Sequence, residues 1–415
     1  MVAVGAAALV PLALARLPSP APTPAGIERA PLAPRSQPLP GEAQATTARA
    51  AAPRPLGSGA ARAGAPAMQR LDPRRSNRSP HRAPRRPRVV WTFPMGAPIA
   101  AAPAVADGLV IVSSLGGKVA AVSLDGKERW SRDLEERIYG APLVQGDEVR
   151  VGVDKGKLVT LDARTGKVKA TLEVDGDADT APAPTPDGGF VFTAGRVAYG
   201  ARRDGTVRWR YKHRRKLYAA PAVGDDGVAY FGAQGGAVLA IAPDGELRWK
   251  AALGSDADAG LSVGEDGAIL AGTDGGEVVA LAPQDGAIRW RAAVGGFVRG
   301  ALAVARDGAV LASSYGPTPA VVALDGRSGA ELWRFAVRGT GAREFGVHGA
   351  PLEDAEGTLI FGAQDDILYA LTPEGQPRWK LQLGGDIDGT AVLTEEFLLV
   401  GCGDGNLYAL AEGGS

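Results

Sequence analysis

The sequence of 415 residues predicts an all-β fold, an eight-bladed β-propeller whose blades are four-stranded antiparallel sheets. Three observations predict it. A paired glycine and tryptophan recur about every forty residues, four short apolar runs separated by turn residues fill each period, and no helical periodicity follows Arg88. We expect the propeller to cover residues 88–415.

Seven tryptophans mark the repeat. Successive gaps between them are 39, 79, 40, 41, 43 and 46 residues, so the double gap implies one repeat in which Ala170 takes the tryptophan position. From Trp130 onward a glycine stands four residues before each of these positions, which keeps the register through the exception. We expect the tryptophans to pack between neighbouring blades as structural wedges; they are Trp91, Trp130, Trp209, Trp249, Trp290, Trp333 and Trp379.

One complete period shows the four strands of a blade. Its apolar runs occupy residues 217–223, 228–232, 238–241 and 246–250, and Asp-Gly or Gly-Gly pairs separate them. Each run has the length of a strand and each break has hairpin chemistry. Runs equivalent to the third strand occur eight times along the chain, so eight blades are expected.

The last repeat lacks a fourth strand, because the sequence ends at Ser415 just after its third apolar run. Residues 88–93, which contain Trp91, stand ahead of the first repeat and have the pattern of that missing strand. We therefore predict that this N-terminal strand completes the last blade and closes the ring without an open edge.

The residues before the propeller differ in composition. Residues 1–15 form an uncharged apolar leader ending Ala-Leu-Ala, which resembles a signal peptide and predicts a periplasmic or secreted protein. It is shorter than the roughly 20 residues of a membrane-spanning helix. Residues 16–87 are rich in Pro, Ala and Arg and contain no aromatic residue, so we expect a disordered linker.

The charges of the two regions are opposite. Residues 1–88 hold 14 arginines and three acidic residues, whereas the chain as a whole has 46 basic and 46 acidic residues, so the propeller is acidic. The arginine-rich end of the linker is expected either to serve as a plain spacer or to attract an anionic surface of the cell envelope. Because no aromatic residue interleaves these arginines, a nucleic-acid partner is not expected.

Few residues have the chemistry of a metal or catalytic site. Cys402 is the only cysteine and is expected to be buried, and the histidines His81, His213 and His348 are widely spaced. This pattern predicts no metal centre, and no nucleophile stands at a fixed spacing from a base. We expect no catalysis and no cofactor.

The repeats differ from one another just before their first strand. If the first strands line the central channel, the polar residues there ring one mouth of it and form a candidate binding face for a protein or peptide. Tyrosines and carboxylates in this ring suit a basic peptide, an amine or a cation, while Arg299 and His348 make a short basic arc. A hydrated mouth without a specific ligand stays open as an alternative. The ring consists of Tyr139, Asp179, Tyr218, Asp258, Arg299, His348 and Asp388, with Ala100 at its eighth position.

Two other segments stand out as places where a partner could bind. The basic segment 210–216 follows one tryptophan-bearing strand, and the insertion 338–345 lengthens the gap between Trp333 and Trp379. Added loop length on a rigid scaffold is often functional. A solvated turn is the alternative for the basic segment.

Residues 323–333, Ala-Leu-Asp-Gly-Arg-Ser-Gly-Ala-Glu-Leu-Trp, resemble the tryptophan-docking motif of the pyrroloquinoline-quinone-type propeller repeat, and Asp162–Gly166 is a second match. The resemblance implies one of two functions. Quinoprotein dehydrogenases carry the quinone and calcium in the channel beneath a disulfide between neighbouring cysteines, whereas this sequence has one cysteine and no long insertions. The other branch contains BamB-like scaffolds of outer-membrane β-barrel assembly, which are lipoproteins; here no cysteine precedes Cys402.

The sequence thus favours a monomeric, non-catalytic scaffold of the cell envelope. A degenerate or active quinoprotein dehydrogenase and a tethered adhesion or sensor module stay open as alternatives.

Overall fold

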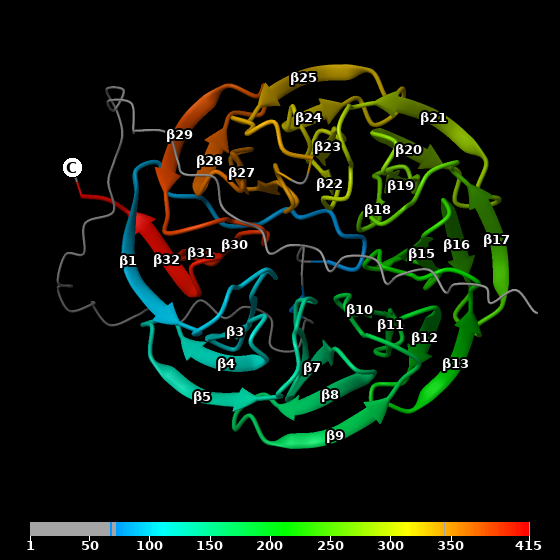
Figure 1. Cartoon of the computed structure of the whole chain (residues 1–415), viewed down its shortest axis with the longest axis horizontal. Helices are drawn as coiled ribbons and strands as arrows, with labels where there is room; N and C mark the ends of the chain where they lie inside the picture. Colours follow the sequence, from blue (N-terminus) through cyan, green and yellow to red (C-terminus); the bar gives the residue numbers. More distant parts are fainter. Residues whose placement is uncertain (1–66, 69–71, 344, 415) are drawn as a thin grey trace, which may run out of the picture. The chain divides into compact units, whose positions relative to one another are not determined.

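The computed structural model describes residues 67–68, 72–343 and 345–414, and the leader at 1–15 lies outside them. Eight four-stranded antiparallel sheets follow one another around a common axis, as Figure 1 shows. The predicted eight-bladed β-propeller is confirmed. No stretch of helix in these described ranges is long and apolar enough to cross a membrane.

In blades 1 to 7 the chain runs from the innermost strand to the outermost, and in blade 8 the outermost strand is β1 from the start of the domain. Blades 1 to 4 contain β2 (Ala104–Ala106), β3 (Leu109–Ser113), β4 (Lys118–Ser123) and β5 (Glu128–Asp133); β6 (Leu143–Gln145), β7 (Glu148–Val153), β8 (Lys157–Asp162) and β9 (Val168–Glu173); β10 (Ala183–Pro184), β11 (Phe190–Ala194), β12 (Val197–Ala201) and β13 (Val207–Lys212); and β14 (Ala222–Val223), β15 (Ala229–Ala233), β16 (Ala237–Ile241) and β17 (Leu247–Ala252). Blades 5 to 8 contain β18 (Ser262–Val263), β19 (Ile269–Gly272), β20 (Glu277–Leu281) and β21 (Ile288–Ala293); β22 (Ala303–Val304), β23 (Val310–Ser313), β24 (Ala320–Leu324) and β25 (Glu331–Ala336); β26 (Leu352–Glu353), β27 (Leu359–Gly362), β28 (Ile367–Leu371) and β29 (Pro377–Gln382); and β30 (Val392–Leu393), β31 (Leu398–Gly401), β32 (Asn406–Glu412) and β1 (Pro87–Pro94).

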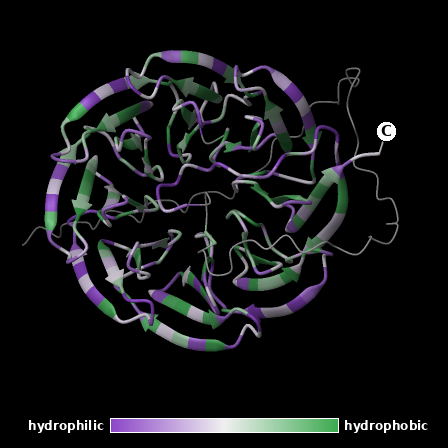
Figure 2. Ribbon diagram, turned by 180° about the vertical axis from the view of Figure 1, so that it is seen from behind, coloured by the Kyte–Doolittle hydropathy of each residue, from purple (hydrophilic) through white to green (hydrophobic). Residues whose placement is uncertain are grey.

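Burial explains the strand sequences. The middle strands of a blade, such as β15 and β16, are buried along their whole length because both faces pack against neighbouring blades. The outermost strand β17 alternates between exposed and buried residues. Figure 2 shows the same difference, with banded outer strands around greener inner ones.

The ring closes as the sequence predicts. Strand β1 pairs antiparallel with β32 from Pro87 opposite Glu412 to Pro94 opposite Asn406, with an irregularity between Val89 and Trp91. The Trp91 indole N–H donates to the carbonyl oxygen of Leu124 in blade 1 at 2.8 Å. The first strand of the domain therefore completes the last blade and also contacts the first.

The tryptophans join successive blades by one recurring contact. Trp130 in blade 1 donates its indole N–H to the carbonyl of Ala163 in blade 2 at 2.9 Å, and its ring lies on Gly166. Trp249 in blade 4 does the same with Pro283 and Gly286 of blade 5. Each docking glycine has a positive φ, so it provides both the turn and the space for the ring.

Two docking glycines allow a matched test. Gly245 has φ +95°, and an added Cβ would lie 2.5 Å from Trp209, whereas Gly205 has φ +86° and no atom within 4 Å because blade 2 lacks its tryptophan. Gly205→Ala should cost about 1 kcal/mol through backbone strain alone. Gly245→Ala should cost about 2–4 kcal/mol because overpacking is added. Urea denaturation of both variants measures the difference; equal losses would contradict this account.

The contact between blades 2 and 3 uses a different device. Arg150 on β7 is fully buried, and its guanidinium donates to the carbonyl of Arg203, the equivalent of the tryptophan acceptor in other blades. It also bonds Gln145 at 3.0 Å and pairs with Glu148, and it lies 4.5 Å from the ring centre of Phe190. A buried arginine thus takes the place of the missing indole N–H.

Residues 72–86, which we call the strap, differ from the expected disordered linker. They pack on the propeller: Arg75 and Asn77 are buried, and the strap crosses the ring near its centre in Figure 1. Ala67 adds a bridge to Val144 on β6. The strap is held by hydrogen bonds rather than by apolar burial, so composition gave no sign of it. The rest of the predicted linker, residues 16–66 and 69–71, lies outside the described residues.

Candidate functional site

The two rims of the ring, at opposite ends of its axis, differ in what surrounds them. Each innermost strand begins at one rim, which we call the upper mouth, and ends at the other, the lower mouth. All seven predicted ring residues lie in the loops that lead into the innermost strands, so they share the upper mouth. The strap contacts the other ends of these strands and therefore lies at the lower mouth.

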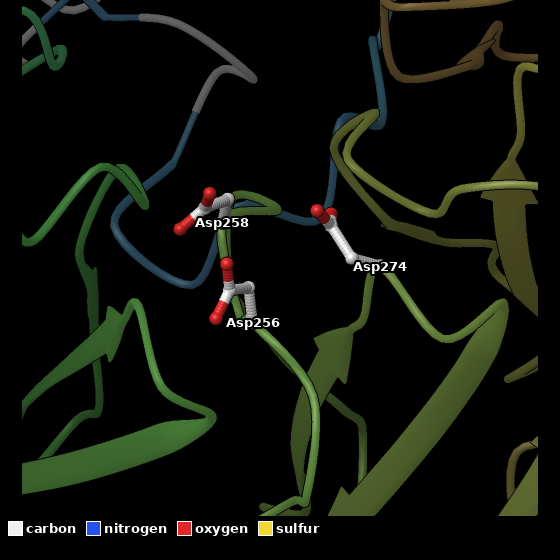
Figure 3. Close-up of side chains that lie close together, drawn as sticks. All are labelled: Asp256, Asp258 and Asp274. Atoms are coloured by element: carbon white, nitrogen blue, oxygen red, sulfur yellow. The ribbon is translucent and has the colours of Figure 1, made fainter. Parts of the chain in front are cut away.

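Three carboxylates come together in blade 5. Asp256 and Asp258 precede β18 and Asp274 follows β19, and one oxygen of each lies within 4.8 Å of the others (Figure 3). Burial, reinforced by the charges of Asp274 and Asp256, raises the pKa of Asp258 to about 6. One buried oxygen of Asp258 accepts no hydrogen bond from the described residues. The predicted Asp258 thus belongs to a local cluster whose other members the ring alignment missed.

Arg299 joins this cluster from blade 6. Its Nε donates to one carboxylate oxygen of Asp274 at 2.7 Å and its Nη2 to the other. The hydrogen bonds and charge of Asp274 raise the pKa of Arg299. The guanidinium is therefore already paired within the chain, and whether Arg299 and His348 act as a basic arc stays a prediction.

His348 lies in an aromatic stack instead. Its ring is 4.6 Å from that of Tyr315, which in turn lies 5.6 Å from Phe297. Isolated bridges tie Tyr315 to Phe297 and to Gly346, so the insertion after β25 is joined to the turn after β23. Phe297, Tyr315 and His348 therefore form an aromatic wall on one side of the upper mouth.

Asp179 lies beside a second carboxylate. Burial, followed by a hydrogen bond and the charge of Asp154, raises the pKa of Asp179 to about 7, while Lys216 opposes the shift. One buried oxygen of Asp179 and one of Asp388 accept no hydrogen bond from the described residues. The upper mouth thus contains three carboxyl groups, Asp179, Asp258 and Asp388, that each have one buried oxygen without a hydrogen bond from the described residues.

The two predicted tyrosines are exposed at the rim, with 42% of Tyr139 and 36% of Tyr218 accessible. Each hydroxyl accepts a hydrogen bond from the basic residue two positions earlier, Arg137 at 3.3 Å and Lys216 at 2.7 Å. In both loops a basic residue stands two positions before the tyrosine, and this spacing in the sequence could have identified both pairs. The rim therefore contains basic residues as well as carboxyl groups.

Asp179 predicts a pH dependence of stability. Its folded pKa lies above its unfolded value, so the folded state binds more protons between about pH 4 and pH 7 and loses stability as the pH rises through that window. The free energy of unfolding of Asp179→Asn, measured relative to wild type, should therefore be about 1 kcal/mol higher at pH 8 than at pH 5. This amount already includes a reduction for the partial exposure of Asp179. Urea denaturation at the two pH values measures it.

Asp204→Asn is the matched control for this measurement. The backbone N–H of Thr206 lowers the pKa of Asp204, so this carboxyl is ionised in the folded and the unfolded state at both pH values, and its substitution should leave the difference between pH 5 and pH 8 unchanged. A difference between wild type and Asp179→Asn that does not change with pH would contradict the prediction.

Other predicted features are engaged within the chain. Cys402 is buried, its Sγ donates to the carbonyl of Gly385 at 3.2 Å, and burial raises its pKa to about 12. Among the strap arginines expected to attract an anionic envelope surface, Arg78 pairs with Glu265 and Arg85 with Glu356. Those charges are neutralised by the propeller itself.

The fold and its docking contacts define the class: an eight-bladed β-propeller with the tryptophan-docking repeat. The family model described as outer membrane protein assembly factor BamB matches residues 83–193, 193–259 and 234–414. The chain therefore belongs to that family. No curated protein matches the sequence.

Solved structures of two functional kinds share the fold. BamB from Moraxella catarrhalis is 20% identical with a TM-score of 0.63, over 78% of this chain and 97% of that one. A europium-containing methanol dehydrogenase is 13% identical with a TM-score of 0.71, over 83% and 97%. The quinohemoprotein alcohol dehydrogenase from Comamonas testosteroni is 13% identical with a TM-score of 0.71, over 84% and 80%. At these identities the likeness concerns the fold alone.

The residues present do not fit a quinone site of the kind the resemblance implies. Its cap needs two neighbouring cysteines, and Cys402 is the only cysteine and is buried in its own blade. From the lower mouth, Arg75 and Asn77 reach backbone carbonyls just before the innermost strands β14 and β26. In the carboxylate cluster, Asp274 is already bound by Arg299.

Proposed function

We propose that this protein is a non-catalytic binding scaffold of the cell envelope, periplasmic or secreted, that engages a protein or peptide partner through its upper mouth. The observation that carries the proposal is that three carboxyl groups on this rim, Asp179, Asp258 and Asp388, each have a buried oxygen without a hydrogen bond from the described residues, and that the same rim has two exposed tyrosines. Such a surface favours basic side chains, because a cation next to these carboxyl groups stabilises their ionised form, which burial disfavours. Membership of the BamB family supports a role as a scaffold.

Site-specific photocrosslinking in the native cells tests this function. A photoreactive phenylalanine analogue at position 139 or 218 replaces a tyrosine that is already exposed, so the fold should be unaffected. We expect both positions to crosslink to one partner protein. Position 168, on outer strand β9 and 49% exposed, is the matched control and should not.

A charge variant adds a second measurement. Replacing Asp179, Asp258 and Asp388 together by asparagine keeps the size of the side chains and removes their charge. The yield of the crosslinked product should fall at least tenfold, or about 1.4 kcal/mol. An unchanged yield, or equal crosslinking from position 168, would overturn the assignment of the upper mouth.

A further inference from the structure

The strap lies along the lower mouth and contacts the blades in one repeated way. Its carbonyl oxygens accept hydrogen bonds from the backbone N–H groups at the same position of four consecutive innermost strands, β14, β18, β22 and β26. The bonds run from Val223 to Pro73 at 2.9 Å, from Val263 to Arg74 at 2.9 Å, from Val304 to Ser76 at 3.0 Å and from Glu353 to Asn77 at 3.0 Å.

The reason for this repetition is the edge of each blade. The innermost strand has a neighbour on one side only, so alternate N–H groups point toward the axis without a partner inside the blade. Upstream of the strap, Ala67 accepts from Val144 of β6 at 2.8 Å. The equivalent residue of β10, between these contacts, is Pro184, which has no N–H to offer.

Two strap side chains donate hydrogen bonds to backbone carbonyls around the axis of the ring. Arg75 Nε donates to the carbonyl of Pro221 at 3.0 Å and its Nη2 to that of Ala181 at 2.9 Å. Asn77 Nδ2 donates to the carbonyl of Pro351 at 2.7 Å. Arg75 is fully buried and Asn77 is 1% exposed, so backbone carbonyls of blades 3, 4 and 7 form a closed cradle for a guanidinium and an amide.

The rim of the lower mouth supplies complementary charge. Its hairpin turns carry acidic residues, and Arg74 lies 3.5 Å from Asp225, Arg78 2.6 Å from Glu265 and Arg85 3.1 Å from Glu356. Of residues 72–86, Ala83 packs against an apolar cluster, whereas the strap contacts described above are polar. The strap is thus held by main-chain bonds and charge, as peptides are held when they add to a sheet edge.

We propose that the lower mouth is a binding site for an extended, arginine-containing peptide, and that residues 73–79 occupy it here as an internal ligand. A basic extended segment of another polypeptide can take the same place when the strap leaves. This site is separate from the upper mouth of the proposed function. As long as the strap is tethered, its high effective concentration keeps the site closed to such a segment.

The full-length chain can be tested after cleavage at one point. A protease site inserted between Arg85 and Arg86, both exposed, leaves the ring-closing strand β1 on the propeller fragment. The probe is a fluorescent synthetic peptide of residues 67–86, followed by fluorescence anisotropy. We expect no binding to the uncut chain and saturable, salt-sensitive binding after cleavage, in exchange with the resident fragment 1–85. The same peptide with Arg75→Ala and Asn77→Ala should bind at least tenfold more weakly.

Each other outcome overturns the proposal. Equal binding of the wild-type and the doubly substituted peptide would mean that the backbone carbonyls of the cradle recognise neither Arg75 nor Asn77. Loss of the resident fragment without uptake of the probe would mean that there is no site for a separate peptide. A resident fragment that stays on the propeller through 1 M NaCl and excess probe would make the strap a fixed part of the fold, not an exchangeable ligand.

Discussion

Replacing Arg150 by leucine is expected to lower the free energy of unfolding by about 3–5 kcal/mol, although leucine or another apolar residue is the rule at this position. The equivalent residues of other second strands include Ile111, Val191 and Leu270, each buried. Arg150→Leu removes the donors that satisfy Gln145 and the carbonyl of Arg203, and it leaves Glu148 without its buried partner. Urea denaturation of wild type and variant measures the loss.

A second substitution tests whether arginine has replaced the indole. Ala170→Trp restores the repeat in blade 2, where the space above Gly205 is open and the carbonyl of Arg203 is the expected acceptor. Alone, it competes with Arg150 for that carbonyl. Combined with Arg150→Leu, it should recover about 1–2 kcal/mol, and the double-mutant cycle should show favourable coupling of that size. Additive effects of the two substitutions would contradict the replacement.

The sequence predicts the fold because short local patterns, which recur in every repeat, determine it. The glycine and tryptophan at fixed spacing encode a docking contact between neighbours, and each of eight blades repeats the same hairpins. The position of β1 follows from counting strands, since an incomplete last blade needs the strand that contains Trp91. The exception at Ala170 is visible in the sequence, but nothing in the repeat marks Arg150 as the residue that compensates for it.

The candidate site was less predictable, because its contacts join parts of the chain that the repeat does not align. The ring residues precede the first strand of each blade, whereas Asp154, Asp274 and Tyr315, which set their charge and orientation, follow second strands. The strap escaped detection for another reason. The propeller binds the strap mainly through the strap's backbone carbonyl oxygens, which every residue has. Only the buried side chains of Arg75 and Asn77 are specific to this segment, and an arginine-rich sequence does not show which of its arginines is buried.

Removal of strand β1 is expected to abolish cooperative folding. A chain of residues 95–415 loses all the pairing of β1 with β32, the burial of Phe93 and the contact of Trp91 with blade 1, and it exposes a central strand as a new edge. The strap is lost as well, so a chain of residues 87–415, which keeps β1, is the matched control. Circular dichroism during urea denaturation should show a cooperative transition for 87–415 and none for 95–415.

A circular permutation separates ring closure from chain length. Pro87 lies opposite Glu412 in the sheet, and Gly413 N–H donates to the carbonyl of Arg86 at 2.7 Å, so the two strands end where a hairpin turn would join them. Joining Gly414 to Pro87, in a chain that runs from residue 95 to 414 and then through 87–94, supplies that turn with two glycines. This chain is one residue shorter than 87–415, contains all the same strands and should recover the cooperative transition. If it unfolds like 95–415, or if 95–415 folds as 87–415 does, closure of the ring by β1 is not what holds the blades together.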